Sequence, residues 1–298
     1  MNNQRTVGTA FLALAISSAA AARDDSADRP FLTSRFWDDG KAEIAFYQVE
    51  RDVNQYGEAK PQKFLMGTYL VKHDFDRLSQ SKARPDAKDK VPSFKWSAFY
   101  EFESDNSYQF KQAWVVNAAQ EDLAPLKASF TSFDWCSNQY RELLFRPDGK
   151  AEFLMRSDDY GNREETFEAP AGSYPVALVP LLVRSLDFSG APSRSFSLLL
   201  EDGSTVKVTA RLEGRESLDL PDGREEAERV RLSFDGDYRS ILSRKGEREE
   251  TYWRGLGAER ALLALESATY RMRLVEIVRS PYWDENVFPR LKHVKTRP

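Results

Sequence analysis

Apolar and polar side chains alternate along most of this chain, and this two-residue period constrains its fold more than any other feature. In residues 94–102, every second position is apolar or aromatic and the positions between them are mostly polar. Successive side chains of a β-strand point to opposite faces, so such a run builds a strand with one apolar face. The pattern predicts antiparallel strands that turn their other face to water. It recurs in residues 42–47, 108–116, 151–155, 206–212, 230–234 and 270–274.

Turn-forming residues separate these runs. Pro147-Asp148-Gly149, Asp202-Gly203 and Pro221-Asp222-Gly223 supply residues that start tight turns or tolerate a positive φ. Aromatic residues, which favour strands, make up 12% of the chain. We therefore expect an all-β, mainly antiparallel fold, built as a large curved sheet or as an open barrel or sandwich.

One internal segment departs from the alternation. Residues 175–188 are almost continuously apolar, which predicts a hydrophobic connector or a helix that Pro180 keeps short or broken. The segment separates two sets of strands, at about residues 30–160 and 190–279. We expect a single β-rich domain over residues 23–298 with one short central helix, and two packed halves are the alternative.

Residues 1–22 predict a secretory signal peptide. Arg5 precedes an apolar run over residues 7–16, and Ala20 and Ala22 form the small-x-small pattern of a cleavage site. The apolar run is too short for a stable membrane anchor, and no later segment approaches membrane-spanning length. We therefore expect a soluble mature protein, either periplasmic or secreted.

Side chains with catalytic or metal-binding chemistry are few. The chain has one cysteine, Cys136, and two histidines, His73 and His293. Cys136 lies too far from the predicted cleavage site to carry a lipoprotein anchor, and we expect it to be structural. Adjacent acids such as Asp158-Asp159 point to opposite faces of a strand, which makes them poor partners in one site. We expect no metal and no cofactor.

Charge argues against a nucleic-acid partner. Lys and Arg number 43 against 47 Asp and Glu, which gives a formal net charge of −4. Binding to phosphates requires a clustered basic face, and the basic residues of this chain form only short clusters.

Aromatic side chains supply the candidate ligand-binding residues. Trp96 and Trp114 lie on neighbouring predicted strands, and Tyr100 shares the face of Trp96. On an open concave sheet these rings suit an apolar ligand or a sugar, whereas on a closed face they belong to the core, which we favour. We also expect Trp37 and Trp283 to pack together and join the two ends of the structure.

The chain resembles a family of uncharacterised exported bacterial proteins. Members sometimes carry the label of septum-formation inhibitors of the Maf type, whose enzymes have a Ser-x-Ser-Pro-Arg motif near the N-terminus. Ser193-Arg194-Ser195 lacks the following Pro-Arg and lies mid-chain, so we expect that label to be a naming error. The resemblance implies export but no activity. It rests on Phe36-Trp37-Asp38-Asp39-Gly40-Lys41-Ala42-Glu43, Tyr56-Gly57-Glu58, Asp134-Trp135-Cys136 and Ser280-Pro281-Tyr282-Trp283.

A second resemblance is architectural. The predicted hairpin series ends in Glu250-Thr251-Tyr252-Trp253 and a long strand over residues 270–278. In this order of strands the chain is similar to periplasmic lipoprotein carriers, whose curved sheets hold apolar ligands. This likeness and the aromatic content favour a non-enzymatic envelope protein that binds a lipid, another apolar or amphipathic ligand, or a protein partner. The alternatives are a hydrolase with two carboxylates across a cleft and a structural or secretion-linked module without a small ligand.

Overall fold

The computed structural model describes residues 27–55, 58–103, 109–243 and 246–294; the predicted signal peptide, residues 1–22, lies outside them. The all-β prediction is confirmed, because the described strands form one sixteen-stranded sheet. The first half of the sheet contains β1 (Ala42–Gln55), β2 (Glu58–Asp76), β3 (Ser81–Lys82), β4 (Lys90–Glu103), β5 (Gln109–Ala119), β6 (Pro125–Phe133), β7 (Asn138–Phe145), β8 (Lys150–Ser157) and β9 (Arg163–Glu168). The second half contains β10 (Ser173–Pro175), β11 (Ser193–Leu199), β12 (Thr205–Leu220), β13 (Gly223–Tyr238), β14 (Glu247–Gly255), β15 (Leu262–Ser267) and β16 (Tyr270–Ser280).

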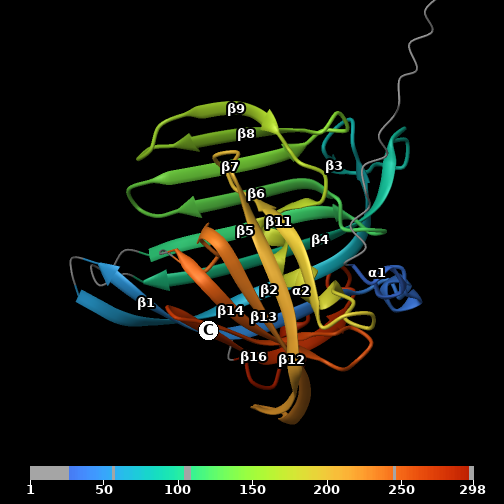
Figure 1. Ribbon diagram of the computed structural model, residues 1–298, viewed down its shortest axis with the longest axis vertical. Coiled ribbons are helices and arrows are strands. Elements are labelled where there is room, and N and C mark those ends of the chain that lie inside the picture. Colours follow the sequence, from blue (N-terminus) through green and yellow to red (C-terminus); the bar gives the residue numbers. More distant parts are fainter. Residues whose placement is uncertain (1–26, 56–57, 104–108, 244–245, 295–298) are drawn as a thin grey trace, which may run out of the picture.

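The two halves join in the middle of the sheet. Strand β16 pairs with β1, with Ala42 opposite Ser280, so the strand order runs from β10 through β16 to β1 and on to β9. Neighbouring described strands are antiparallel except for β10 and β11. In Figure 1, strands β4–β9 form a wall, and β11–β14 run steeply across it. The sheet therefore curls into two layers around an interior.

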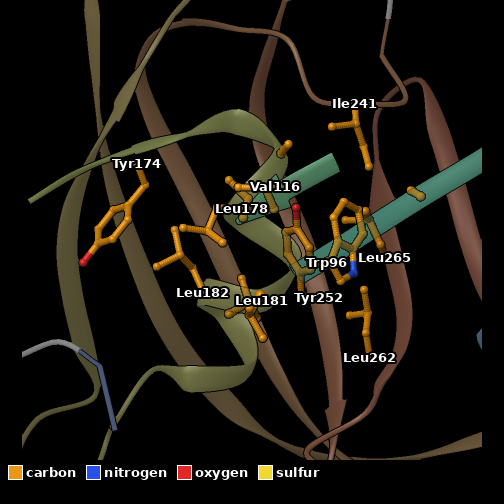
Figure 2. Packing of buried hydrophobic residues seen from close by; sticks show 14 of the residues in the cluster. Trp96, Val116, Tyr174, Leu178, Leu181, Leu182, Ile241, Tyr252, Leu262 and Leu265 are labelled. Carbon is orange, nitrogen blue, oxygen red and sulfur yellow. The ribbon is translucent and has the colours of Figure 1, made fainter. Parts of the chain in front are cut away.

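A short helix fills that interior, as the sequence predicts. The turn η2 (Val176–Leu178) leads into α2 (Val179–Ser185), and every residue of α2 is buried. Pro180 lies in the first turn, where a missing N–H interrupts no helical hydrogen bond. Figure 2 shows side chains of this segment among those of both layers; its labelled residues are Trp96, Val116, Tyr174, Leu178, Leu181, Leu182, Ile241, Tyr252, Leu262 and Leu265.

A buried ion pair ties α2 to the sheet. Arg184 Nη1 and Nη2 donate to the two carboxylate oxygens of Glu43 at 2.7 and 2.8 Å, and Nη2 also donates to the Glu259 carbonyl at 2.6 Å. The Arg184 and Glu43 side chains are only 4% and 5% exposed. Both charges are therefore satisfied inside the core rather than by water.

A second buried arginine closes the end of the helix. Arg254 Nη1 donates to the carbonyls of Val183 and Leu186 at 2.9 and 2.7 Å. Its Nε and Nη2 donate to Glu228 at 3.0 and 2.8 Å. The last carbonyls of a helix lack partners within the helix, so Arg254 stabilises the point where α2 ends.

The first part of β1, residues 42–47, is buried on both faces, which corrects the prediction of one face toward water. Tyr47 and Val49 join the central core on one face. Ile44 and Phe46, on the other face, lie in a second apolar cluster. That cluster is covered by the C-terminal segment, residues 281–294, through Val287, Leu291 and Val294.

One carboxylate holds the covering segment in place. Glu276 on β16 accepts hydrogen bonds from the backbone N–H groups of Lys292, His293 and Val294 at 2.7, 2.9 and 3.3 Å. Burial raises the pKa of Glu276, but the three N–H groups outweigh it and hold the pKa below its usual value. The carboxylate is thus kept charged where it anchors the segment. The short helices α1 (Arg29–Leu32), η1 (Arg35–Asp38) and η3 (Phe288–Arg290) complete the described elements.

The structure gives Trp37 and Trp283 different neighbours, so the predicted contact between them is wrong. Trp37 is buried, with its ring 5.6 Å from that of Phe31 and 5.2 Å from that of Phe94. Trp283 is 53% exposed and stacks edge-on against Tyr282. The two ends of the chain meet through the β1–β16 pairing instead.

Candidate functional site

A large open cleft, about 1020 Å³ in volume, lies between the two layers. Its floor is the inward face of β5–β8. The facing wall consists of the turn between β11 and β12 and of residues 237–243, which span the end of β13 and the loop after it. Residues 175–177, just ahead of α2, line the end that adjoins the core.

Strand register arranges the cleft floor in three rows. From solvent toward the core, the rows are Gln112–Ser132–Gln139, Trp114–Phe130–Arg141–Met155 and Val116–Ala128–Leu143–Phe153. The first row is polar, the second is mixed and the third is apolar and buried. A molecule with one polar and one apolar end matches this gradient in polarity.

In the middle row, an arginine lies against two aromatic rings. The Trp114 and Phe130 ring centroids are 4.5 Å apart. Arg141 Cζ lies 4.2 Å from the Phe130 centroid and 5.4 Å from the Trp114 centroid. A guanidinium is attracted to the electron-rich face of such rings, so both contacts help to fix Arg141 on the floor.

Glu201 reaches Arg141 from the opposite wall. It lies in the turn between β11 and β12, and its carboxylate accepts a hydrogen bond from Arg141 Nη1. Gly203 in the same turn has a φ of +81°, and a Cβ there would lie 2.9 Å from Cγ of Phe167 on β9. Glycine meets both demands because it has no Cβ. The close packing of this turn on Phe167 brings Glu201 across the cleft.

The second part of the wall is held by hydrogen bonds to its backbone. The Tyr100 hydroxyl donates to the Ile241 carbonyl at 3.0 Å. Arg51 Nη1 donates to the Leu242 carbonyl at 3.4 Å. Tyr100 lies on β4 and Arg51 lies on β1, so these bonds connect two strands beside the cleft floor to residues 237–243.

A buried carboxyl group contacts the same wall. Glu250 on β14 is 1% exposed and accepts hydrogen bonds from the hydroxyls of Tyr252, at 2.6 Å, and Tyr270. Burial has the largest effect and raises the pKa of Glu250, and the charge of Glu247 raises it further. Hydrogen bonds from both tyrosines and from Ser240 lower it, and the net result is a pKa of about 7. Ser240 itself lines the cleft. Glu250 therefore changes charge near neutral pH without direct exposure to water.

The three aromatic candidates lie at different depths. Trp96 is 5% exposed and faces a closed core cavity of about 20 Å³. Tyr100 is also buried, with its ring stacked 5.0 Å from that of Phe64, and it borders the cleft. Trp114 is half-buried on the cleft floor. Sequence reasoning missed Phe130, Arg141, Met155 and Glu201.

The other reactive side chains have local partners. Cys136 is exposed in the turn between β6 and β7, where its N–H donates to Asp134 at 2.7 Å. His73 contacts Asn117 at 3.1 Å, and burial lowers its pKa. His293 contacts Asp222 at 2.7 Å. Within the described ranges, no three His, Cys, Asp or Glu side chains are grouped to hold a metal ion, and no helix is long and apolar enough to cross a bilayer.

Comparison with known proteins shows a shared fold. The sequence matches no family model, and no curated protein matches it. Among solved structures, the fold is similar to that of a β-barrel-like protein from Brucella abortus with a domain of unknown function, DUF1849. The TM-score is 0.51 at 9% identity, over 80% of this chain and 97% of that chain. This likeness supports a β-rich fold shared with an uncharacterised protein and does not bear on the Maf label or on lipoprotein carriers.

Proposed function

We propose that this protein is a non-enzymatic binding protein whose cleft takes up an apolar or amphipathic ligand. The observation that carries the proposal is the cleft floor, which grades from polar through aromatic to apolar between two layers of sheet. Binding sites for small molecules are concave and mostly apolar, with a few polar groups that orient the ligand. The two inner rows of the floor fit this description, and the outer row and the facing wall supply the polar groups.

Glu201 and Asp134, two of the six carboxylates among the described residues that line the cleft, have partners that favour binding over hydrolysis. Glu201 is paired with Arg141, and Asp134 accepts hydrogen bonds from the N–H groups of Cys136 and Ser137 at 2.7 and 2.9 Å. A glycosidase needs one carboxyl group that gives a proton and a second one across the bond it breaks. Both of these carboxylates have partners suited to their charged form instead.

A charge on the cleft floor tests the proposal. In Met155→Asp, we expect the affinity for the neutral fluorescent probe N-phenyl-naphthylamine to fall about tenfold or more, because the probe then has to desolvate a carboxylate. The measurement is a fluorescence titration of the purified protein.

Leu154→Asp is the matched control. Leu154 is the neighbouring residue on β8, and its side chain points to the opposite face of the sheet. We expect the affinity of Leu154→Asp for the same probe to stay within about twofold of the wild type, since the cleft is unchanged. Equal losses in the two variants, or no binding by the wild type, would contradict a ligand site in this cleft.

We further propose that the protein works outside the cytosol, in the periplasm or beyond the cell. The support is the signal-peptide pattern of residues 1–22. The mature chain is then expected to begin near Arg23, which N-terminal sequencing of protein from the envelope fraction measures. An intact N-terminus in the cytosolic fraction would overturn this part of the proposal and leave the ligand site untouched.

A further inference from the structure

Two N–H groups on the cleft floor have no acceptor among the residues that the structure describes. Trp114 Nε1 and Arg141 Nε are both shielded from solvent, and neither donates a hydrogen bond to any residue that the structure describes. They belong to one contact, because Arg141 Cζ lies 5.4 Å from the Trp114 ring centroid. The hydrogen bond from Arg141 to Glu201 comes from Nη1 and leaves Nε unused.

Unpaired donors indicate the chemistry of a missing partner. Shielded N–H groups without acceptors are unfavourable, and proteins pair nearly all of them. Trp Nε1 and the arginine nitrogens are donors only, so the partner has to be an acceptor. Carboxylate and phosphate oxygens are acceptors that match the planar guanidinium of an arginine especially well.

We propose that the cleft binds single-chain amphiphiles through an oxyanion head, a carboxylate or a phosphate, that accepts hydrogen bonds from Trp114 Nε1 and Arg141. This inference rests on the proposed function and adds the identity of the head group. The middle row then holds the head group of the ligand, and the alkyl chain of the ligand lies along Leu143 and Phe153 toward residues 175–177.

Glu201 is the competitor for this position. It is the acidic partner of Arg141, and the side chains of Glu201 and Arg141 are 38% and 22% exposed. A carboxylate that is this exposed can turn to water when a second oxyanion arrives. An incoming oxyanion displaces Glu201 from the guanidinium, so removal of the Glu201 charge favours binding.

Isothermal titration calorimetry with three ligands of equal chain length tests the head group. We expect the wild type to bind dodecanoate, monododecyl phosphate or both about tenfold or more tightly than dodecanol, because a charge-assisted hydrogen bond is worth at least that factor. Arg141→Gln should bind each of the three ligands only as tightly as the wild type binds dodecanol. A preference between the two oxyanions distinguishes a fatty-acid from a phosphate ligand.

Three further variants separate recognition of the head from support of the wall. Glu201→Gln should bind the preferred oxyanion a few-fold more tightly, whereas a wall-holding role for the Arg141–Glu201 pair predicts weaker binding. Trp114→Phe keeps a ring but removes the donor, and it should reduce the preference for oxyanions without weakening dodecanol binding. Arg156→Gln, on the outer face of β8 and paired with Glu164, is the matched control and should behave as the wild type.

The outcomes distinguish this inference from the proposed function. If the wild type binds dodecanol and the oxyanions equally, and Arg141→Gln changes nothing, the head-group inference is wrong and the cleft remains a binding site. If Glu201→Gln and Arg141→Gln weaken binding alike, the inference is also wrong, because the pair then only supports the wall. If no ligand binds to any variant, the proposed function itself fails.

Discussion

Replacing Arg184 by methionine should lower the free energy of unfolding by about 3–5 kcal/mol, the cost typical of breaking a buried ion pair. The variant leaves the Glu43 carboxylate in the core without its partner, because the Glu43 side chain is 5% exposed and accepts two hydrogen bonds from Arg184. The loss also frees the carbonyl of Glu259. Urea unfolding followed by tryptophan fluorescence measures the effect.

Two companion variants make this prediction specific to the buried pair. Arg184→Met combined with Glu43→Leu removes both charges, so it should be clearly more stable than the single variant. Arg271→Met breaks an ion pair with Glu50 in which the arginine side chain is 59% exposed, and it should cost less than about 1 kcal/mol. A double variant no more stable than Arg184→Met would show that the cost comes from lost packing rather than from the unpaired charge.

Glu250 should make the protein less stable as the pH rises from 5 to 8. Burial raises its folded-state pKa to about 7 from an ordinary 4.5. The folded state therefore holds more protons than the unfolded state between these two values, and stability falls as the pH rises through them. The full contribution is present below the unfolded pKa, and a shift of this size corresponds to about 3 kcal/mol lost above the folded pKa.

Glu250→Gln removes this titration. Relative to the wild type, the variant should gain about 2.5 kcal/mol between pH 5 and pH 8, in unfolding curves measured at both values. Glu249→Gln is the control, because Glu249 is the neighbouring residue on β14 and its side chain is 57% exposed. A stability difference between Glu250→Gln and wild type that stays constant with pH would mean that Glu250 titrates normally.

The strands were predictable because their signal is local. Alternation in residues 94–102 predicts which side chains of β4 face inward, and Trp96 and Tyr100 are indeed buried. The burial of Glu43 was not predictable in this way. Whether the polar side of a strand meets water depends on what covers it, and here the cover includes Arg184, far along the chain on α2. Period-two patterns do not contain that information.

The candidate site was predictable only in part, for a related reason. Trp96 and Trp114 lie on the same inward face of adjacent strands, yet one belongs to the closed core and the other to the cleft floor. Whether such a ring lies in the core or on the cleft floor depends on its position along the strand and on the packing of the β11–β12 turn. Arg141 could not be assigned from its neighbours in sequence, because its role depends on cross-strand Phe130 and on Glu201 across the cleft.

The pairing of β1 with β16 has a consequence for how the protein is made. Ala42 lies opposite Ser280 and Arg51 opposite Tyr270, so one edge of the first long strand has no neighbour until the last strand has been synthesised. Contacts between such distant parts of a chain slow folding. The fold therefore cannot be completed until nearly the whole polypeptide has been synthesised.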